Sequence, residues 1–335
     1  MSEKTFIIAE AGVNHNGDIE LAMQMIDAAK EAGVDAVKFQ TYDTEKIVTR
    51  EADKAKYQKE GCTEEDTQFE MLKKLELTPQ EFTKLADYAK EKDIMFLSSP
   101  LDRGSVDLLE RIDVPMYKLG SGELINHPLI RYISLFNKPL ILSTGMATLE
   151  EIKEAVMVAQ VPELTILHCV TNYPSPIGDT NLNFIKTLKK QFPKHRIGYS
   201  DHTEGIAVSL AAVALGACVI EKHFTLDKNL PGPDHKASID PEELKQLVTG
   251  IRKIEQALGS ECKTITPEEK EIMKIARKSL TAITNIPEGT LIRDDMITPK
   301  RPGTGVPPKD LNQLIGRKAK IKIPRNTTIT WDMIE

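Results

Sequence analysis

Two histidines and two lysines are the residues best suited to chemistry, because each lies at the end of a short apolar run. His202 and His223 belong to RIGYSDH and CVIEKHF, and Lys38 and Lys118 to AVKFQ and MYKLGSGE. Two imidazoles can share one divalent ion and leave coordination positions open for water and a substrate oxygen. A site completed by oxygen ligands in this way is more typical of Mn²⁺, Mg²⁺ or Co²⁺ than of structural zinc, whose sites are closed by protein ligands. The alternative is that each histidine only caps its strand by hydrogen bonding. An unpaired buried ammonium is costly, so the lysines indicate an anionic ligand.

Hydroxyl and acidic residues end further apolar runs. Together with the lysines, the hydroxyls could neutralise a small dianion or trianion, and the turn Gly120-Ser121-Gly122 offers free backbone N–H groups. Some of these serines are equally well explained as ordinary turn residues. A carboxylate near a metal-bound water can act as a base, and one near a sugar hydroxyl can position it. The hydroxyls are Ser99, Ser121, Ser143 and Ser200, and the acids are Glu10, Glu123, Glu221 and Asp234.

Alternating strands and helices must position these side chains. Eight apolar runs occur within residues 1–258 and are separated by stretches of helical periodicity, which is typical of a parallel sheet with covered faces. Eight strand–helix units match the number in a closed (β/α)8 barrel. An open doubly wound sheet is also disfavoured because GVNHNG, which follows the first strand, lacks the GxGxxG spacing. In such a barrel all strands end at one rim, so distant residues meet in one pocket and an enzyme is indicated. Helices are expected over 19–32, 79–92, 105–111, 128–136, 149–160, 183–191, 205–215 and 241–258.

The pattern changes after the barrel. We predict a catalytic domain over 1–258, a polar linker over 259–278 and a small β domain over 279–335. In the last of these, Ile286–Ile297 (IPEGTLIRDDMI) aligns with Ile323–Ile334 (IPRNTTITWDMI). Two copies of one short unit predict a pseudo-symmetric domain.

One connection in the barrel is unusually long. Residues 41–77 exceed an ordinary strand-to-helix loop and are rich in Lys and Glu. Rim loops of this length are often substrate lids, but a solvated excursion without a role explains the segment equally well.

Composition excludes several classes of protein. The chain has 335 residues and a net charge of −6 without a sustained Lys/Arg run, so the basic footprint of a nucleic-acid binder is missing. Cys62, Cys169, Cys218 and Cys262 lack CxxC spacing, which argues against zinc knuckles and disulfides. The most apolar stretch, 206–220, is shorter than the roughly 20 residues of a membrane span. No signal peptide is recognisable, and we expect a cytoplasmic protein without a membrane or nucleic-acid partner.

Eight motifs in order identify a family. The strings IIAEAGVNHNG, VKFQ, YKLGSGE, ILSTGM, HCVTNYPSP, GYSDHT, EKHFTLDKNLPGPDH and KRPGTG resemble the sialic acid (N-acetylneuraminate) synthases, or nonulosonate synthases, over nearly the whole chain. The resemblance implies a (β/α)8 TIM barrel followed by a small C-terminal β-rich antifreeze-like (SAF) domain, in a domain-swapped homodimer. It also implies a transferase that condenses phosphoenolpyruvate with an N-acetylated mannosamine-type sugar.

The resemblance also implies roles for individual residues of this chain. The residues assigned as catalytic are Glu10, Glu221, His202 and His223. The two histidines would hold a divalent ion, for which Mn²⁺ is expected before Mg²⁺ or Co²⁺. Arg301 would enter the partner subunit's pocket and bind the N-acyl group. Some family members have Asn at the position of Thr171 and Thr at Ser99, so Asn172 could supply the amide contact. Phosphoenolpyruvate would contact Lys38, Ser99, Lys118, Ser121, Ser143 and Ser200, and the sugar Gln40, Glu123, Thr171, Asn172, Tyr173 and Asp234.

The implied reaction joins phosphoenolpyruvate to N-acetylmannosamine and yields N-acetylneuraminate and phosphate by C–O cleavage. One alternative is a legionaminate synthase that uses 2,4-diacetamido-2,4,6-trideoxymannose. A second is an enzyme like the ketodeoxyoctulosonate phosphate synthases, which would need another cationic patch for a phosphorylated aldose. A third is an ice-binding or carbohydrate-binding tail on a scaffold barrel. Cationic residues oppose the ice-binding alternative: Lys300, Arg301, Lys309, Arg317, Lys318 and Lys320.

Overall fold

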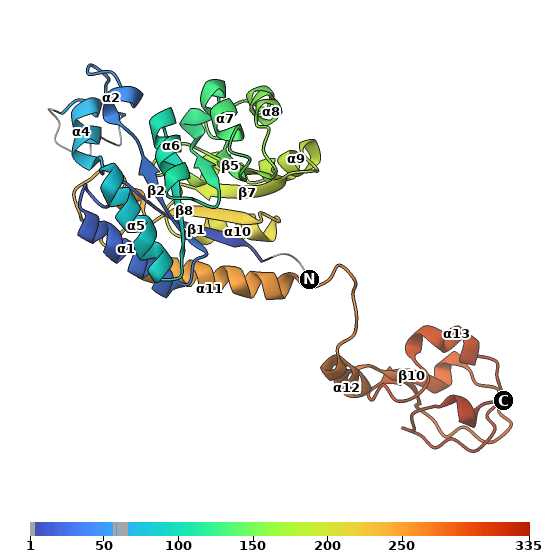
Figure 1. The fold of residues 1–335 in the computed structure, drawn as a ribbon. Coiled ribbons are helices and arrows are strands. Elements are labelled where there is room, and N and C mark those ends of the chain that lie inside the picture. The colour runs from blue at the N-terminus through green and yellow to red at the C-terminus, as the bar shows by residue number, and fades with distance from the viewer. Residues whose placement is uncertain (1–3, 56–57, 59–65) are drawn as a thin grey trace. The chain divides into compact units, whose positions relative to one another are not determined.

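The computed structural model describes residues 4–55, 58 and 66–335. Within these residues, one parallel sheet has eight strands in the order β3-β2-β1-β8-β7-β6-β5-β4, and β3 also lies beside β4, which brings the two ends together. The predicted (β/α)8 barrel is therefore confirmed (Figure 1). The strands are β1 Phe6–Gly12, β2 Ala36–Thr41, β3 Met95–Pro100, β4 Tyr117–Leu119, β5 Leu140–Ser143, β6 Leu164–Cys169, β7 Arg196–Asp201 and β8 Val219–His223.

Helices cover the outside of the sheet, as the periodicity predicts. Their starts follow local signals: Thr78 and Asp240 form capping boxes and precede a proline at the first helical position. The first helix ends at Gly33, whose φ of 81° is left-handed. The helices are α1 Ile19–Ala32, α2 Thr44–Ile47, α4 Gln68–Leu75, α5 Pro79–Glu91, α6 Arg103–Arg111, α7 His127–Ser134, α8 Leu149–Val158, α9 Phe184–Gln191, α10 Ala207–Ala214 and α11 Pro241–Leu258, with 3-10 turns η1 Ser121–Glu123, η2 Ile177–Asp179 and η3 His235–Ala237.

The long connection 41–77 contains α2 and α4. Residues 56–57 and 59–65 of this segment, including Cys62, lie outside the described residues. No helix among the described residues is both long enough and apolar enough to cross a membrane.

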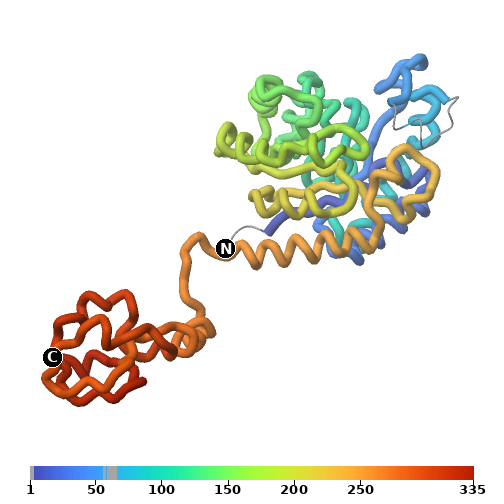
Figure 2. The backbone as a smooth tube through the Cα atoms, turned by 180° about the vertical axis from the view of Figure 1, so that it is seen from behind, coloured from blue at the N-terminus to red at the C-terminus, as the bar shows by residue number. Residues whose placement is uncertain are grey.

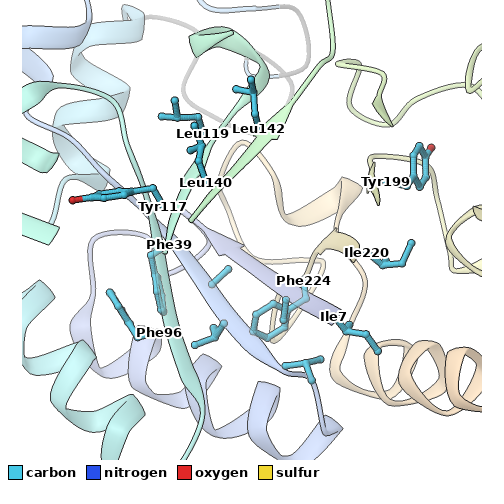
Figure 3. Packing of buried hydrophobic residues seen from close by; sticks show 14 of the residues in the cluster. Ile7, Phe39, Phe96, Tyr117, Leu119, Leu140, Leu142, Tyr199, Ile220 and Phe224 are labelled. Carbon is cyan, nitrogen blue, oxygen red and sulfur yellow. The ribbon is translucent and has the colours of Figure 1, made fainter. Parts of the chain in front are cut away.

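The core has two layers, one on each face of the barrel sheet. Between sheet and helices lies a large cluster in which the rings of Phe39 and Phe96 stack 5.7 Å apart (Figure 3). Inside the barrel, a smaller apolar cluster, which we call the plug, fills the interior toward the amino ends of the strands. The buried members of this plug are Ile8, Ala36, Leu97, Ile141, Leu167 and Val219.

The remaining chain forms a second compact unit, Ser260–Glu335, after a first unit of Met1–Gly259 (orange to red in Figure 2). The predicted linker contains a helix, α12. Ile286 and Ile323, the first residues of the two repeat copies, exchange backbone hydrogen bonds of 2.8 Å in both directions, and the repeat thus builds a paired core. The elements are α12 Pro267–Ala276, β9 Ser279–Ala282, η4 Asp294–Met296, β10 Ile297–Lys300, η5 Pro308–Asp310, α13 Leu311–Leu314 and η6 Trp331–Met333.

Candidate active site

A layer of polar side chains lies directly above the apolar plug. Side chains alternate along a strand, so a residue two positions beyond a plug residue also points into the barrel. The chain places a charged or polar residue at that position on most strands. The resulting polar layer comprises Glu10, Lys38, Ser99, Ser143, Cys169 and Glu221, together with Lys118 and Ser200 from β4 and β7.

Three ion pairs between two lysines and two glutamates organise the polar layer. Lys38 Nζ lies 2.5 Å from Glu10 Oε2, 3.8 Å from Glu221 Oε2 and 3.0 Å from Ser99 Oγ. Lys118 Nζ lies 3.3 Å from Glu221 Oε1 and donates to Ser143 Oγ at 2.8 Å. All four charged side chains are at most 5% exposed. With every group ionised, the lysine and glutamate charges cancel.

Burial and these contacts shift the pKa values in opposite directions. Burial raises the pKa of Glu10, with Lys38 opposing and Glu221 adding to the rise. Burial also disfavours the Glu221 carboxylate, but Lys118 and Lys38 outweigh it and lower the pKa of Glu221. The pKa of Lys118 is lowered by burial, against the pull of Glu221. Glu10 is thus the carboxyl best suited to exchange protons near neutral pH.

His202 and His223 lie beside the polar layer, with ring centroids 5.3 Å apart. His202 Nδ1 lies 2.8 Å from the Val170 carbonyl, which leaves Nε2 for a ligand. His223 Nδ1 is buried without a hydrogen-bond partner and lies 3.8 Å from Asp234 Oδ2. Burial first, then the neighbouring His202 and Lys38, lower the pKa of His223 well below its ordinary value, so this ring is neutral.

His223 thus offers the neutral imidazole that a divalent ion binds. Burial opposes the protonated form of His202, but Cys169 outweighs it and raises the pKa of His202, so an ion would compete with a proton for this ring. Within the described part of the chain, no three His, Cys, Asp or Glu side chains come together as a ligand set. Water and substrate oxygens would therefore have to complete the coordination.

A cavity of about 230 Å³ opens above the polar layer. The rings of Tyr173 and His202 lie 4.1 Å apart between centroids and are tilted by 37°, and Gln40 donates to Glu10 at 3.3 Å. The cavity is lined by residues from every strand except β6, and the loop after β6 contributes Thr171 and Tyr173. The predicted site residues that line it are Glu10, Lys38, Gln40, Ser99, Lys118, Ser121, Ser143, Thr171, Tyr173, Ser200, His202, Glu221, His223 and Asp234.

Three predicted site residues do not line this cavity. Glu123 accepts a hydrogen bond of 2.6 Å from Asn126, and the side chain of Asn172 is exposed. Arg301 belongs to the second unit, where its exposed side chain donates to the Ala276 carbonyl.

Three further polar residues at strand ends, Asp201, Lys222 and His168, point away from the site. Asp201 and Lys222 form an ion pair of 3.1 Å, and Asp201 also accepts from Ser209 of α10, so both face the helices. His168 packs against Phe184 of α9. These residues stabilise the layer between sheet and helices.

The sequence interpretation missed Cys169. Its Sγ lies 3.7 Å from His202 Nδ1, and the pKa of the thiol is lowered by His202 although burial opposes this. The two-residue step from the plug residue Leu167 is the signal that could have identified Cys169 in place of His168. Five apolar cavity residues, Val13, Met71, Leu72, Leu75 and Leu101, were also missed.

Comparisons with known proteins agree with this geometry. The NeuB family profile matches residues 25–263, and the SAF domain profile matches residues 277–335. An N,N'-diacetyllegionaminic acid synthase from Campylobacter jejuni is 47% identical over 95% of this chain and 96% of its own length. The human N-acetylneuraminate-9-phosphate synthase is 38% identical over 98% of this chain and 92% of its own length.

Solved structures give the same result. The N-acetylneuraminic acid synthetase of Leptospira borgpetersenii matches with a TM-score of 0.71 and 36% identity, over 81% of this chain and 90% of that one. The predicted family and fold are therefore confirmed. The chain belongs to the NeuB family of nonulosonic acid synthases and carries a SAF domain, which makes it an enzyme of the transferase class.

Proposed function

We propose that this enzyme condenses phosphoenolpyruvate with the open-chain form of an N-acetylated mannosamine-type sugar and releases phosphate. The polar layer is the observation that carries the proposal. Lys38 and Lys118 offer two buried cations to a phosphate and a carboxylate, and three serines surround them. Protonation of Glu10, which its raised pKa favours, would leave the layer with a net positive charge for the anion.

The residues of the polar layer suit the steps of this reaction. C3 of phosphoenolpyruvate forms a bond with the aldehyde carbon, whose oxygen gains a proton. Water then adds to C2 and loses one proton. The C2–O bond to phosphate breaks while the new C2 hydroxyl passes its proton to the departing phosphate, which leaves hydrogen phosphate and a 2-keto acid. Glu10 can give the first proton and accept the second, because its pKa lies above the ordinary carboxyl range. Lys38 and Lys118 stabilise the departing phosphate.

His202 and His223 are the residues that would hold a divalent ion, with Mn²⁺ preferred to Mg²⁺ or Co²⁺. Their spacing, the free Nε2 of His202 and the unpartnered Nδ1 of His223 support this proposal. When bound, the ion supplies Lewis-acid polarisation of a carbonyl oxygen.

Two acceptor sugars remain candidates. N-acetylmannosamine is the sugar predicted from the sequence. The trideoxy diacetamido sugar is favoured by two relatives named N,N'-diacetyllegionaminic acid synthase, which are 47% and 43% identical, against 38% for the human enzyme. We therefore propose 2,4-diacetamido-2,4,6-trideoxymannose. Among the described residues that line the cavity, Lys38 and Lys118 are the lysines and there is no arginine, which disfavours a phosphorylated acceptor.

We also propose the domain-swapped homodimer, in which Arg301 reaches the partner's cavity. Exposed apolar side chains support an interface: Ile125, Met146 and Ile177 follow β4, β5 and β6, and Ile275 lies on α12. At substrate concentrations below KM, mixing the impaired variants Lys118→Ala and Arg301→Ala should raise activity above that of either variant alone, because a mixed dimer regains one intact site. No recovery after co-refolding would contradict the swap.

A cytoplasmic location completes the proposal. Cys169, Cys218 and Cys262 are free thiols, as expected in a reducing compartment.

The decisive assay measures phosphate release from phosphoenolpyruvate with each sugar, and identifies the product by mass spectrometry. Phosphoenolpyruvate labelled with ¹⁸O at the bridging oxygen should deliver the label to phosphate, because the C2–O bond breaks. Label retained in the sugar acid would contradict the mechanism, and no release with either sugar would contradict the function.

A further inference from the structure

One side of the cavity is apolar, and the proposed chemistry does not use it. Val13, Met71, Leu72, Leu75 and Leu101 line the cavity and pack together in a cluster separate from the main core. We call these five side chains the apolar wall. Apart from the Met71 thioether, a weak acceptor, these side chains carry no hydrogen-bonding group for a polar part of a ligand.

The apolar wall is fixed to the barrel. Three of its residues lie on α4, which is held from two sides. Tyr42 OH, just beyond β2, donates to the Leu72 carbonyl at 3.1 Å. A Cβ at Gly17 would lie 2.4 Å from the Lys74 carbonyl, so the loop after β1 packs tightly against the end of α4. Helix α4 lies next to α2 at one edge of the barrel (Figure 1). The wall is thus a preformed surface of the pocket.

The apolar wall lies beyond the polar layer, toward the cavity mouth. Val13 follows Glu10 by three residues and Leu101 follows Ser99 by two, past the ends of β1 and β3 in the direction of the chain. The proposed reaction requires the aldehyde carbon C1 of the sugar at the polar layer. C6 is at the opposite end of an open-chain aldose and would therefore lie on the mouth side of the polar layer, the side on which the wall lies.

We propose that the apolar wall makes the enzyme selective for acceptors with a methyl group at C6, that is, for 6-deoxy aldoses. The proposal rests on the proposed condensation and adds the feature of the pocket that discriminates between sugars. A C6 methyl group buries apolar surface against Leu72 and Met71. A C6 hydroxyl group in the same place would lose its hydrogen bonds to water and gain none from the wall. Gln58 also lines the cavity, but its side-chain oxygen already accepts from the Ala55 N–H.

Two acceptors that differ by one oxygen atom test this proposal: N-acetylmannosamine and its 6-deoxy analogue. We expect kcat/KM, measured by phosphate release, to be roughly tenfold or more higher for the 6-deoxy sugar, as is typical for discrimination by an apolar pocket. Equal kcat/KM values would overturn the role of the wall while leaving the condensation intact. No phosphate release with these sugars or the trideoxy diacetamido sugar would overturn the condensation and this proposal together.

Leu72→Gln tests the assignment to the wall. Leu72 is half-buried and glutamine is a good helix former, so the fold should tolerate it. We expect the preference for the 6-deoxy sugar to fall toward parity, with the KM for phosphoenolpyruvate unchanged. Leu72→Met keeps an apolar surface and should keep the preference. Met157→Gln is the matched control, because Met157 is an exposed apolar residue of α8 outside the pocket. This variant should keep the wild-type preference for the 6-deoxy sugar. A preference that persists in folded Leu72→Gln would overturn the proposal.

Discussion

Glu221→Gln tests the charge arrangement of the polar layer. The Glu221 carboxylate lies 3.3 Å from the Lys118 ammonium and 3.8 Å from the Lys38 ammonium, and accepts a hydrogen bond of 2.9 Å from Ser200. Its side chain is only 5% exposed, so solvent screens this charge poorly. Glutamine preserves the shape of the side chain but removes the negative charge between the two lysines.

The expected loss of stability follows from this burial. Breaking a buried ion pair by neutralising one partner costs about 3–5 kcal/mol. Lys38 keeps its contact with Glu10, so we expect the lower end, about 3 kcal/mol. For a barrel of this size, a loss of about 3 kcal/mol lowers the unfolding midpoint by roughly 6–12 °C. Phosphate or phosphoenolpyruvate would restore negative charge beside the lysines and should stabilise the variant more than the wild type.

Thermal unfolding followed by circular dichroism, with and without phosphoenolpyruvate, measures both effects. Glu150→Gln is the matched control, because Glu150 is exposed and lies 3.7 Å from Lys153. A surface change of this kind should move the midpoint by about 2 °C or less. An unchanged midpoint in Glu221→Gln, or equal stabilisation of variant and wild type by the ligand, would refute the reasoning.

Four further variants test other parts of the site. His223→Ala should abolish turnover and weaken Mn²⁺ binding in calorimetry; full activity in chelated buffer would contradict this. Lys118→Ala should raise the KM for phosphoenolpyruvate more than that for the sugar, and the reverse order would count against its role. Arg301→Ala should raise mainly the KM for N-acylated acceptors, and an equal loss with acceptors lacking the N-acyl group would argue otherwise. In the folded wild type, the raised pKa of Glu10 keeps this carboxyl protonated at pH values above 4.5, where the unfolded chain has released the same proton. The free energy of unfolding therefore falls as pH rises above 4.5. Glu10→Gln should flatten that slope between pH 5 and 8, and an unaltered slope in thermal melts would contradict the raised pKa.

Local patterns in the sequence were sufficient for the order of elements. Short apolar runs predicted the eight strands in order, and helical periodicity predicted α1, α5 and α11 to within a residue, because caps and prolines mark the helix ends. The repeat in the tail predicted two copies of one unit in a small β domain, and the structure pairs the first residues of the copies, Ile286 and Ile323. Most of the predicted site residues also lie around one cavity, since parallel strands end at a common rim.

Only the tertiary structure decided which neighbour at each strand end faces the cavity. Cys169 points inward and His168 outward, and Glu221 lies in the polar layer while Lys222 pairs with Asp201 behind the sheet. Strands buried on both faces read as continuous apolar runs, so the two-residue alternation is hidden in the sequence. The apolar wall was equally hidden, because α4 joins the cavity through packing against the loop at Gly17, a contact between segments far apart in the chain.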